Sequence, residues 1–174
     1  MNEQRLKEFK AIGLRCDYRE NPIGIDNTAP RLSWKMKAYG QDRAQSAYRV
    51  LAAAAEDGFE GSLLWDSGKV PCDKSVGIIY GGPTLSSRVR VYWKVQIWDE
   101  NDVESVWSEC AFFEMGLLNE ADWSAKWICA PNDVTAPYFR KAWQSVNKPV
   151  SGRVYICGLG YYELYMTQFS GNEI

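Results

Sequence analysis

Hydrophobic and polar residues alternate along residues 89–99 of the chain. The odd-numbered positions from 89 to 97 carry valine, isoleucine and Trp93, whereas the even-numbered positions carry Lys94 and other polar or amphipathic residues. A period of two is typical of a strand with one buried face. Turn-forming residues at 99–104 precede a second extended run, so the sequence predicts a long antiparallel hairpin over residues 89–116.

Shorter apolar or alternating runs lie upstream, separated by clusters of glycine, proline, aspartate and asparagine. One of them leads into the four alanines of Ala52–Ala55, a composition that favours a helix. The segment is too short for an independent helix and also fits the strand period, so we favour a strand there. Together with the runs at 31–36, 46–54, 63–70 and 75–80, this pattern predicts an all-β domain over residues 1–117. About seven strands are expected, as in a fibronectin type III or immunoglobulin-like β-sandwich.

The pattern changes after residue 117. Asn119 is a candidate N-cap for a short helical turn, and Trp127 and Ile128 are expected to enter a strand that stops near Pro131. A lone hairpin has too little apolar surface to fold by itself. We therefore expect residues 118–174 to be a linker and the incomplete start of a second β-domain, with further strands at 137–146 and 151–169.

Composition narrows the chemistry that the chain can perform. It has no histidine, which excludes serine–histidine and cysteine–histidine catalytic pairs and every histidine-containing metal site. No metal site and no cofactor are expected. The five cysteines are widely spaced, which predicts reduced and mostly buried thiols; they are Cys16, Cys72, Cys110, Cys129 and Cys157.

Charge gives no sign of a polyanionic partner. The chain has 20 basic and 22 acidic residues, a formal net charge of −2 and a pI of about 5.3, with the basic residues scattered along it. Nucleic acid and membranes are therefore not expected as partners. The polar N-terminus lacks the apolar run of a signal peptide, so a cytoplasmic location is expected.

Carboxylates are the remaining familiar catalytic groups. Glycoside hydrolysis needs two of them held ~5–9.5 Å apart in a concave site. Nothing in the spacing indicates such a pair, and the acidic residues of 99–104 are explained by turn formation, so no catalytic residue is assigned. The candidates considered are Asp17, Glu20, Asp26, Asp66, Asp99, Glu100, Asp102, Glu104 and Glu163.

Eight tryptophans suggest a second possibility, because aromatic faces stack on sugar rings. Trp34, Trp93 and Trp127 fall at positions expected to be buried and are interpreted as core residues. Tyr92 and Trp98 lie on the opposite face of their strand, where packing by a neighbouring domain is the favoured explanation. The alternative is a carbohydrate-binding module that uses exposed aromatic residues, namely Trp98, Trp107 and Tyr92.

Six segments, taken in order, resemble the N-terminal region of bacterial α-L-rhamnosidases of glycoside hydrolase family 78. They are residues 14–36, 44–53, 63–70, 92–118, 122–128 and 158–165. The resemblance implies a fibronectin type III-like sandwich followed by the opening strands of a jelly-roll-like accessory domain. It also implies that the family's general acid and general base lie in a later (α/α)₆ barrel, where no position of this chain matches them.

The resemblance therefore implies a non-catalytic accessory role for this chain within an inverting enzyme that hydrolyses terminal α-L-rhamnosides. Its expected partners are the downstream (α/α)₆ barrel and β-domains of the same polypeptide. Rhamnose-containing glycans are a further expected class of partner.

Overall fold

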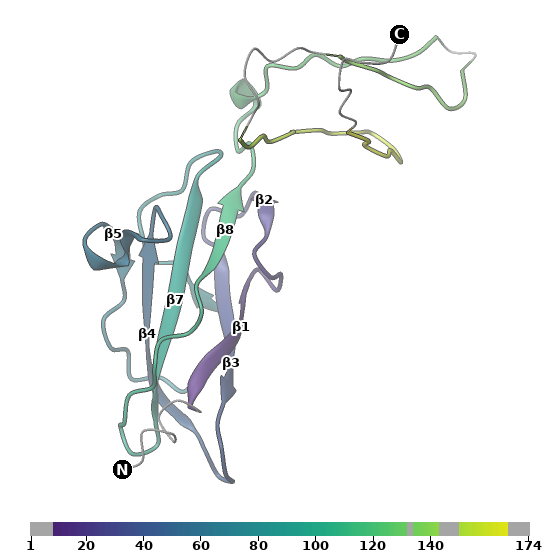
Figure 1. Ribbon diagram of the computed structural model, residues 1–174. Coiled ribbons are helices and arrows are strands. Elements are labelled where there is room, and N and C mark those ends of the chain that lie inside the picture. The colour runs from purple at the N-terminus through teal and green to yellow at the C-terminus, as the bar shows by residue number, and fades with distance from the viewer. Residues whose placement is uncertain (1–8, 132–133, 143–149, 167–174) are drawn as a thin grey trace. The chain divides into compact units, whose positions relative to one another are not determined.

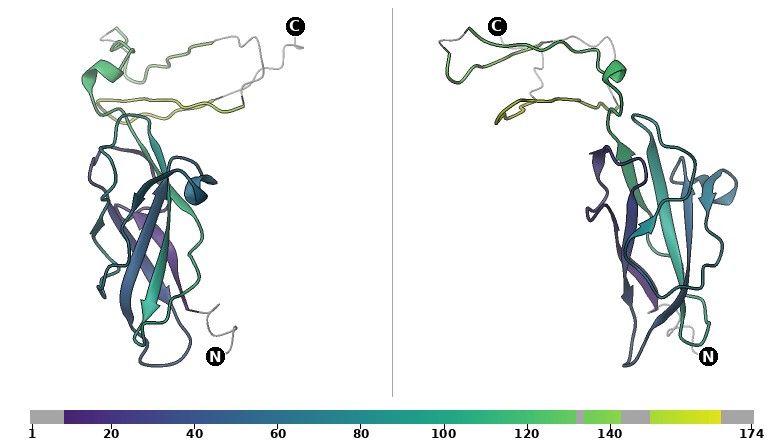
Figure 2. Two further views of the ribbon diagram at one scale, coloured as in Figure 1. Left: turned by 90° about the vertical axis from the view of Figure 1, so that its left-hand side faces the viewer. Right: turned by 180° about the vertical axis from the view of Figure 1, so that it is seen from behind.

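The computed structural model describes residues 9–131, 134–142 and 150–166, and the chain divides into two compact units between Lys126 and Trp127. The first unit contains a three-stranded sheet, in the order β1-β3-β6, and a five-stranded sheet, in the order β2-β8-β7-β4-β5 (Figure 1). Figure 2 shows the two layers from further directions. The strands are β1 (Lys10–Cys16), β2 (Ile23–Ile25), β3 (Arg31–Lys37), β4 (Gln45–Ala53), β5 (Leu63–Asp66), β6 (Ile78–Ile79), β7 (Arg90–Asp99) and β8 (Ala111–Met115).

The core lies between the two sheets, as the alternating pattern predicts. Val91, Trp93, Val95 and Ile97 of β7 are completely buried and contact buried residues of both sheets. β4 pairs antiparallel with β7, so the prediction of a strand rather than a helix at this segment is confirmed. The predicted all-β sandwich is confirmed as well.

The second half of the predicted hairpin is less regular than the first. β8 pairs antiparallel with β7, but only from Ala111 onwards. Before β8, two serine hydroxyls accept hydrogen bonds from backbone amides of β7: Ser108 Oγ from Val95 N (2.9 Å) and Ser105 Oγ from Ile97 N (3.1 Å). Side-chain acceptors thus replace part of the strand ladder along this edge of β7.

Two strands were not among the predicted runs. Gly13 lies within β1 at φ +59, where the register against β3 shifts, and this irregularity breaks the expected alternation. The three-residue β2 pairs parallel with β8. Beside this pairing, the side-chain oxygen Oδ1 of Asn21 accepts a hydrogen bond from Phe112 N at 2.9 Å.

Beyond β8, one local prediction is confirmed. The 3₁₀-helix η2 (Glu120–Asp122) begins after Asn119, and the side chains of Asn119 and Asp122 form a reciprocal capping box. A second 3₁₀-helix, η1 (Gly58–Glu60), follows β4.

The strands expected in the second unit are not formed among its described residues. Trp127 is 71% exposed, so its interpretation as a core residue is wrong, whereas Trp34 and Trp93 are buried as expected. Tyr138 and Leu159 are also exposed, at 100% and 92%. Apolar residues in this segment have no completed sheet to pack against, which explains why the pattern alone did not produce strands. Residues 143–149 and 167–169 of the predicted strands lie outside the described residues.

The cysteine prediction needs a correction. All five thiols are free, but Cys110, Cys129 and Cys157 are exposed and Cys72 is partly buried, so the thiols are not mostly buried. Cys16 alone matches the expectation: it is 1% exposed, and burial raises its pKa to about 12.

Candidate functional site

The predicted sugar-binding aromatics lie on the outer face of the five-stranded sheet, the side that points away from the core. Tyr92 and Trp98 of β7 point outward there, alternating with the buried residues of the same strand. Trp107 comes from the segment between β7 and β8. Other outward side chains of this face are Arg49, Arg90, Lys94, Phe112 and Glu114.

Trp98 is only 8% exposed. The Lys69 ammonium lies 4.9 Å from its ring centroid and also donates a hydrogen bond to the Asp102 carboxylate. A cation held over an aromatic ring is an attractive contact that occupies the ring face. Most of the Trp98 ring is therefore covered by contacts within the chain.

Two further cations cover aromatic residues of this face. Lys94 Nζ lies 4.4 Å from the Phe59 ring centroid and 5.0 Å from that of Trp107. The Arg90 guanidinium lies 4.4 Å from the Phe112 centroid. Each of these cations lies against an aromatic ring. The rings of this face are therefore covered by contacts within the chain more than they are free to stack on a ligand.

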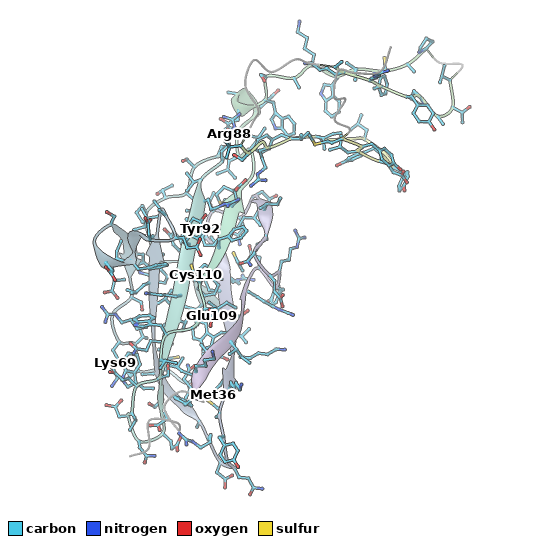
Figure 3. All side chains as sticks on the ribbon, viewed as in Figure 1. Met36, Lys69, Arg88, Tyr92, Glu109 and Cys110 are labelled. Atoms are coloured by element: carbon cyan, nitrogen blue, oxygen red, sulfur yellow. The ribbon has the colours of Figure 1, made fainter. Side chains whose placement is uncertain are left out.

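The three predicted aromatic residues share one face but form no cluster. Tyr92 and Trp98 are six residues apart on β7, which corresponds to ~20 Å along a strand. Figure 3 shows Tyr92 and Lys69 toward opposite ends of this sheet. Tyr92 and Trp107 are half-buried. Sugar binding by Tyr92, Trp98 and Trp107 stays a prediction.

Several of the candidate carboxylates have structural roles. Asp99 Oδ1 accepts hydrogen bonds from Asn101 N and Val103 N, each at 2.9 Å, so the turn interpretation of residues 99–104 is confirmed. Its other oxygen pairs with Arg43 at 2.8 Å. Asp66 pairs with Arg49 at 2.6 Å, and this hydrogen bond holds the pKa of Asp66 below its usual value.

Asp17, another of the candidate carboxylates, also has a structural role. Asp17 accepts hydrogen bonds from Arg31 N (2.9 Å) and Asn27 Nδ2 (3.0 Å), which joins the turn after β1 to the start of β3.

Within the described residues, no three histidine, cysteine, aspartate or glutamate side chains form a group that suits a metal ion. No helix in the same residues is long and apolar enough to cross a membrane.

The segment that leaves the sandwich, residues 117–122, is fastened to the loop before β7. Leu118 N donates to Ser87 Oγ at 2.8 Å, and the Ser87 hydroxyl donates to the Asp122 carboxylate. Arg88 donates to the backbone oxygen of Asp122 at 2.9 Å, and Asn119 N donates to Asp122 Oδ2 at 3.1 Å. We call these contacts the exit clasp. Of its residues, only Asn119, the N-cap, was identified from the sequence.

The exit clasp is expected to weaken in acid. The hydrogen bond from Ser87 lowers the pKa of Asp122, so the charged form is favoured in the folded state. Its contribution is therefore present above the ordinary aspartate pKa and is lost as pH falls through the lowered value. Asp122→Ala should reduce the amide-exchange protection factors of Leu118 and Asn119 about tenfold at pH 6.

At pH 2 the protection factors of the wild-type chain and the variant should lie closer together than at pH 6, because a larger fraction of Asp122 is protonated there. Glu120→Ala, on the same turn, is the matched control and should leave both amides protected. An Asp122→Ala profile that coincides with the wild type at both pH values would contradict the role given to Asp122.

Comparison with known proteins adds an independent line of evidence. Residues 11–119 match the family model described as "Rha78A-like, N-terminal immunoglobulin domain". An alpha-L-rhamnosidase of Formosa agariphila is 39% identical over 94% of this chain and 20% of its own length. One from Streptomyces avermitilis is 44% identical over 75% of this chain and 13% of its own length.

A solved structure agrees with these sequence relatives. The crystal structure of Streptomyces avermitilis alpha-L-rhamnosidase complexed with L-rhamnose superposes with a TM-score of 0.68 at 41% identity. The match covers 71% of this chain and 12% of that one. The chain thus spans about a fifth or less of the length of these relatives.

Proposed function

The chain belongs to the family of Rha78A-like N-terminal immunoglobulin domains, and on this basis we propose that it is a non-catalytic accessory part of an α-L-rhamnosidase. Its role is to pack on the domains that follow in the longer polypeptide and to orient them. The longer protein hydrolyses terminal α-L-rhamnosides in this proposal, and the bond-breaking groups come from outside these residues.

The exit clasp is the observation that carries the orienting role. A chain that leaves a domain freely has few hydrogen bonds between the leaving segment and the domain. Here Ser87 and Arg88 hold both the start and the end of the leaving segment, and Leu118 packs against the core. The direction in which residues 117–122 leave the sandwich is therefore fixed by side chains of the sandwich itself.

The pairing of the carboxylates supports the non-catalytic part of the proposal. A glycosidase acid is held in a concave site that raises its pKa. Asp66, Glu100 and Asp122 instead have pKa values below their usual range, because each accepts hydrogen bonds. A lowered pKa keeps the carboxylate ionised, and an ionised carboxylate binds cations and amide N–H groups. A general acid must instead hold a proton, so a lowered pKa does not suit that role.

Hydrolysis of an aryl α-L-rhamnoside tests the proposal. The purified 174-residue chain is expected to release no aryl alcohol above the buffer rate, because it supplies no general acid. The full-length Streptomyces avermitilis relative serves as the positive control under the same conditions. A rate above buffer that follows the 174-residue chain through purification would show that the chain is itself catalytic.

A further inference from the structure

The outer face of the three-stranded sheet is strongly basic, although the chain as a whole is slightly acidic. Leu32 and Trp34 of β3 point into the core, so the residues between and beyond them point outward. Register pairs place outward residues of β1 opposite them. Five outward cations form what we call the basic face: Lys10, Arg15, Arg31, Lys35 and Lys37.

Few acidic residues offset these charges. Lys10 lies 3.8 Å from Glu109, a residue whose side chain is 95% exposed, and Arg15 lies 3.2 Å from Glu20. Figure 3 labels Glu109. Among the residues that the structure describes, no carboxylate is recorded within 4.0 Å of the other three cations, Arg31, Lys35 and Lys37.

Folding does not explain this arrangement. Lys10 and Lys37 are direct cross-strand partners, and like charges in that position destabilise a sheet. Lys35 lies between Arg31 and Lys37 on β3 and pairs with Ile12 of β1, so the middle of the face also carries a cation. A bound anion would offset the repulsion that the isolated domain carries.

The layout favours a polymer with repeated negative charges. Arg31, Lys35 and Lys37 lie along one strand over ~20 Å. Ser33 is the outward position of β3 that carries no cation, and Arg15 of β1 pairs with it. Lysine is depleted in protein–protein interfaces, and three of the five cations are lysine, which argues against an acidic protein as the partner. Neither β1 nor β3 presents an outward aromatic residue, so binding there would depend on charge and not on ring stacking.

We propose that the basic face binds an anionic polysaccharide, whose repeated acidic groups pair with successive cations. The inference of a carbohydrate rests on the proposed function, since the longer protein would act on glycans. The face lies on the opposite side of the sandwich from the predicted aromatic residues Tyr92 and Trp98. It is a distinct site with a different recognition chemistry.

Binding of polygalacturonate to the purified 174-residue chain tests this proposal. The chain should bind the polymer at low salt, and the affinity should fall as salt increases, since released counterions drive such binding. Lys35→Gln/Lys37→Gln should weaken binding roughly five- to tenfold. Neutral dextran should not bind.

The matched control is Lys126→Gln/Lys141→Gln, which removes the same charge from exposed positions outside the basic face. It should change the affinity by less than about twofold. Equal weakening in both variants would show that only net charge matters and would overturn the proposal. Absence of wild-type binding would overturn it too.

Poly-L-glutamate distinguishes a carbohydrate from an acidic protein as the partner. Weaker binding than to polygalacturonate supports the proposal, whereas equal or tighter binding would overturn it in favour of an acidic protein surface. All four lysines are exposed, and Lys37→Gln removes the repulsion with Lys10, so circular dichroism should show no variant with an unfolding midpoint below that of the wild type. Failure of this test leaves the non-catalytic role standing, because that role is measured by rhamnoside hydrolysis.

Discussion

Replacing Trp93 with alanine should lower the free energy of unfolding of the sandwich by about 3–5 kcal/mol. Trp93 is completely buried, and its cross-strand neighbours are both alanines, Ala52 in β4 and Ala111 in β8. Small neighbours on both sides cannot fill the space that the indole leaves, so the cavity term adds to the lost burial. The indole Nε1 has no hydrogen-bond partner among the described residues, so the expected loss is one of packing.

Lys94→Ala is the matched control for Trp93→Ala, since it lies next to Trp93 on the same strand but points outward. Its loss removes the contacts with Phe59 and Trp107, and we expect a cost below about 1 kcal/mol. Equilibrium denaturation in urea, followed by circular dichroism, measures both values. Similar midpoints for the two variants would show that the two faces of β7 are assigned wrongly.

The strands that the sequence predicts correctly are those whose pattern follows burial closely. β7 and β4 alternate because one face of each lies against the core, and β3 has the same property. β1 was missed because the irregularity at Gly13 interrupts its period, and β2 because three residues are too few to show one. Local pattern predicts a strand only where the backbone is regular for several residues.

The surfaces were less predictable than the core. The alternating pattern correctly placed aromatic positions such as Trp98 on the face that points away from the core. It did not identify the lysines that cover these rings, because Lys69 is distant from Trp98 in sequence. The basic face could not be inferred from scattered basic residues, because only the pairing of β1 with β3 places Lys10 beside Lys37. Charge clusters formed by strand register are invisible to composition.

Trp127 shows why the second unit could not be predicted from pattern alone. Its position fits a buried strand residue, yet it is exposed among the described residues. An apolar residue becomes buried only when other strands complete a sheet around it. The alternating pattern reports a residue's suitability for a sheet, and the surrounding chain determines whether that sheet forms.

Arg90→Met should cost about 2 kcal/mol in unfolding free energy, the second largest effect that we expect for a single substitution. Arg90 and Glu114 are directly opposite each other in β7 and β8, and the guanidinium contacts Glu114 Oε2 at 2.6 Å and 2.9 Å. The Glu114 side chain is 9% exposed, so losing its cation leaves a carboxylate largely out of water. Arg90 itself is 32% exposed, which places the cost below that of a fully buried pair.

The double variant Arg90→Met/Glu114→Gln separates lost pairing from lost packing. If the cost of Arg90→Met comes from the lost ion pair with the buried Glu114 carboxylate, removing that charge should restore at least about 1 kcal/mol of the unfolding free energy. Glu114→Gln alone is the remaining corner of the cycle, and urea denaturation at pH 7 measures all four proteins. A double variant as unstable as the sum of the two single variants would show that Arg90 acts by covering Phe112 with its guanidinium and side-chain methylenes. The pair would then contribute packing to the outer face and no electrostatic coupling between β7 and β8.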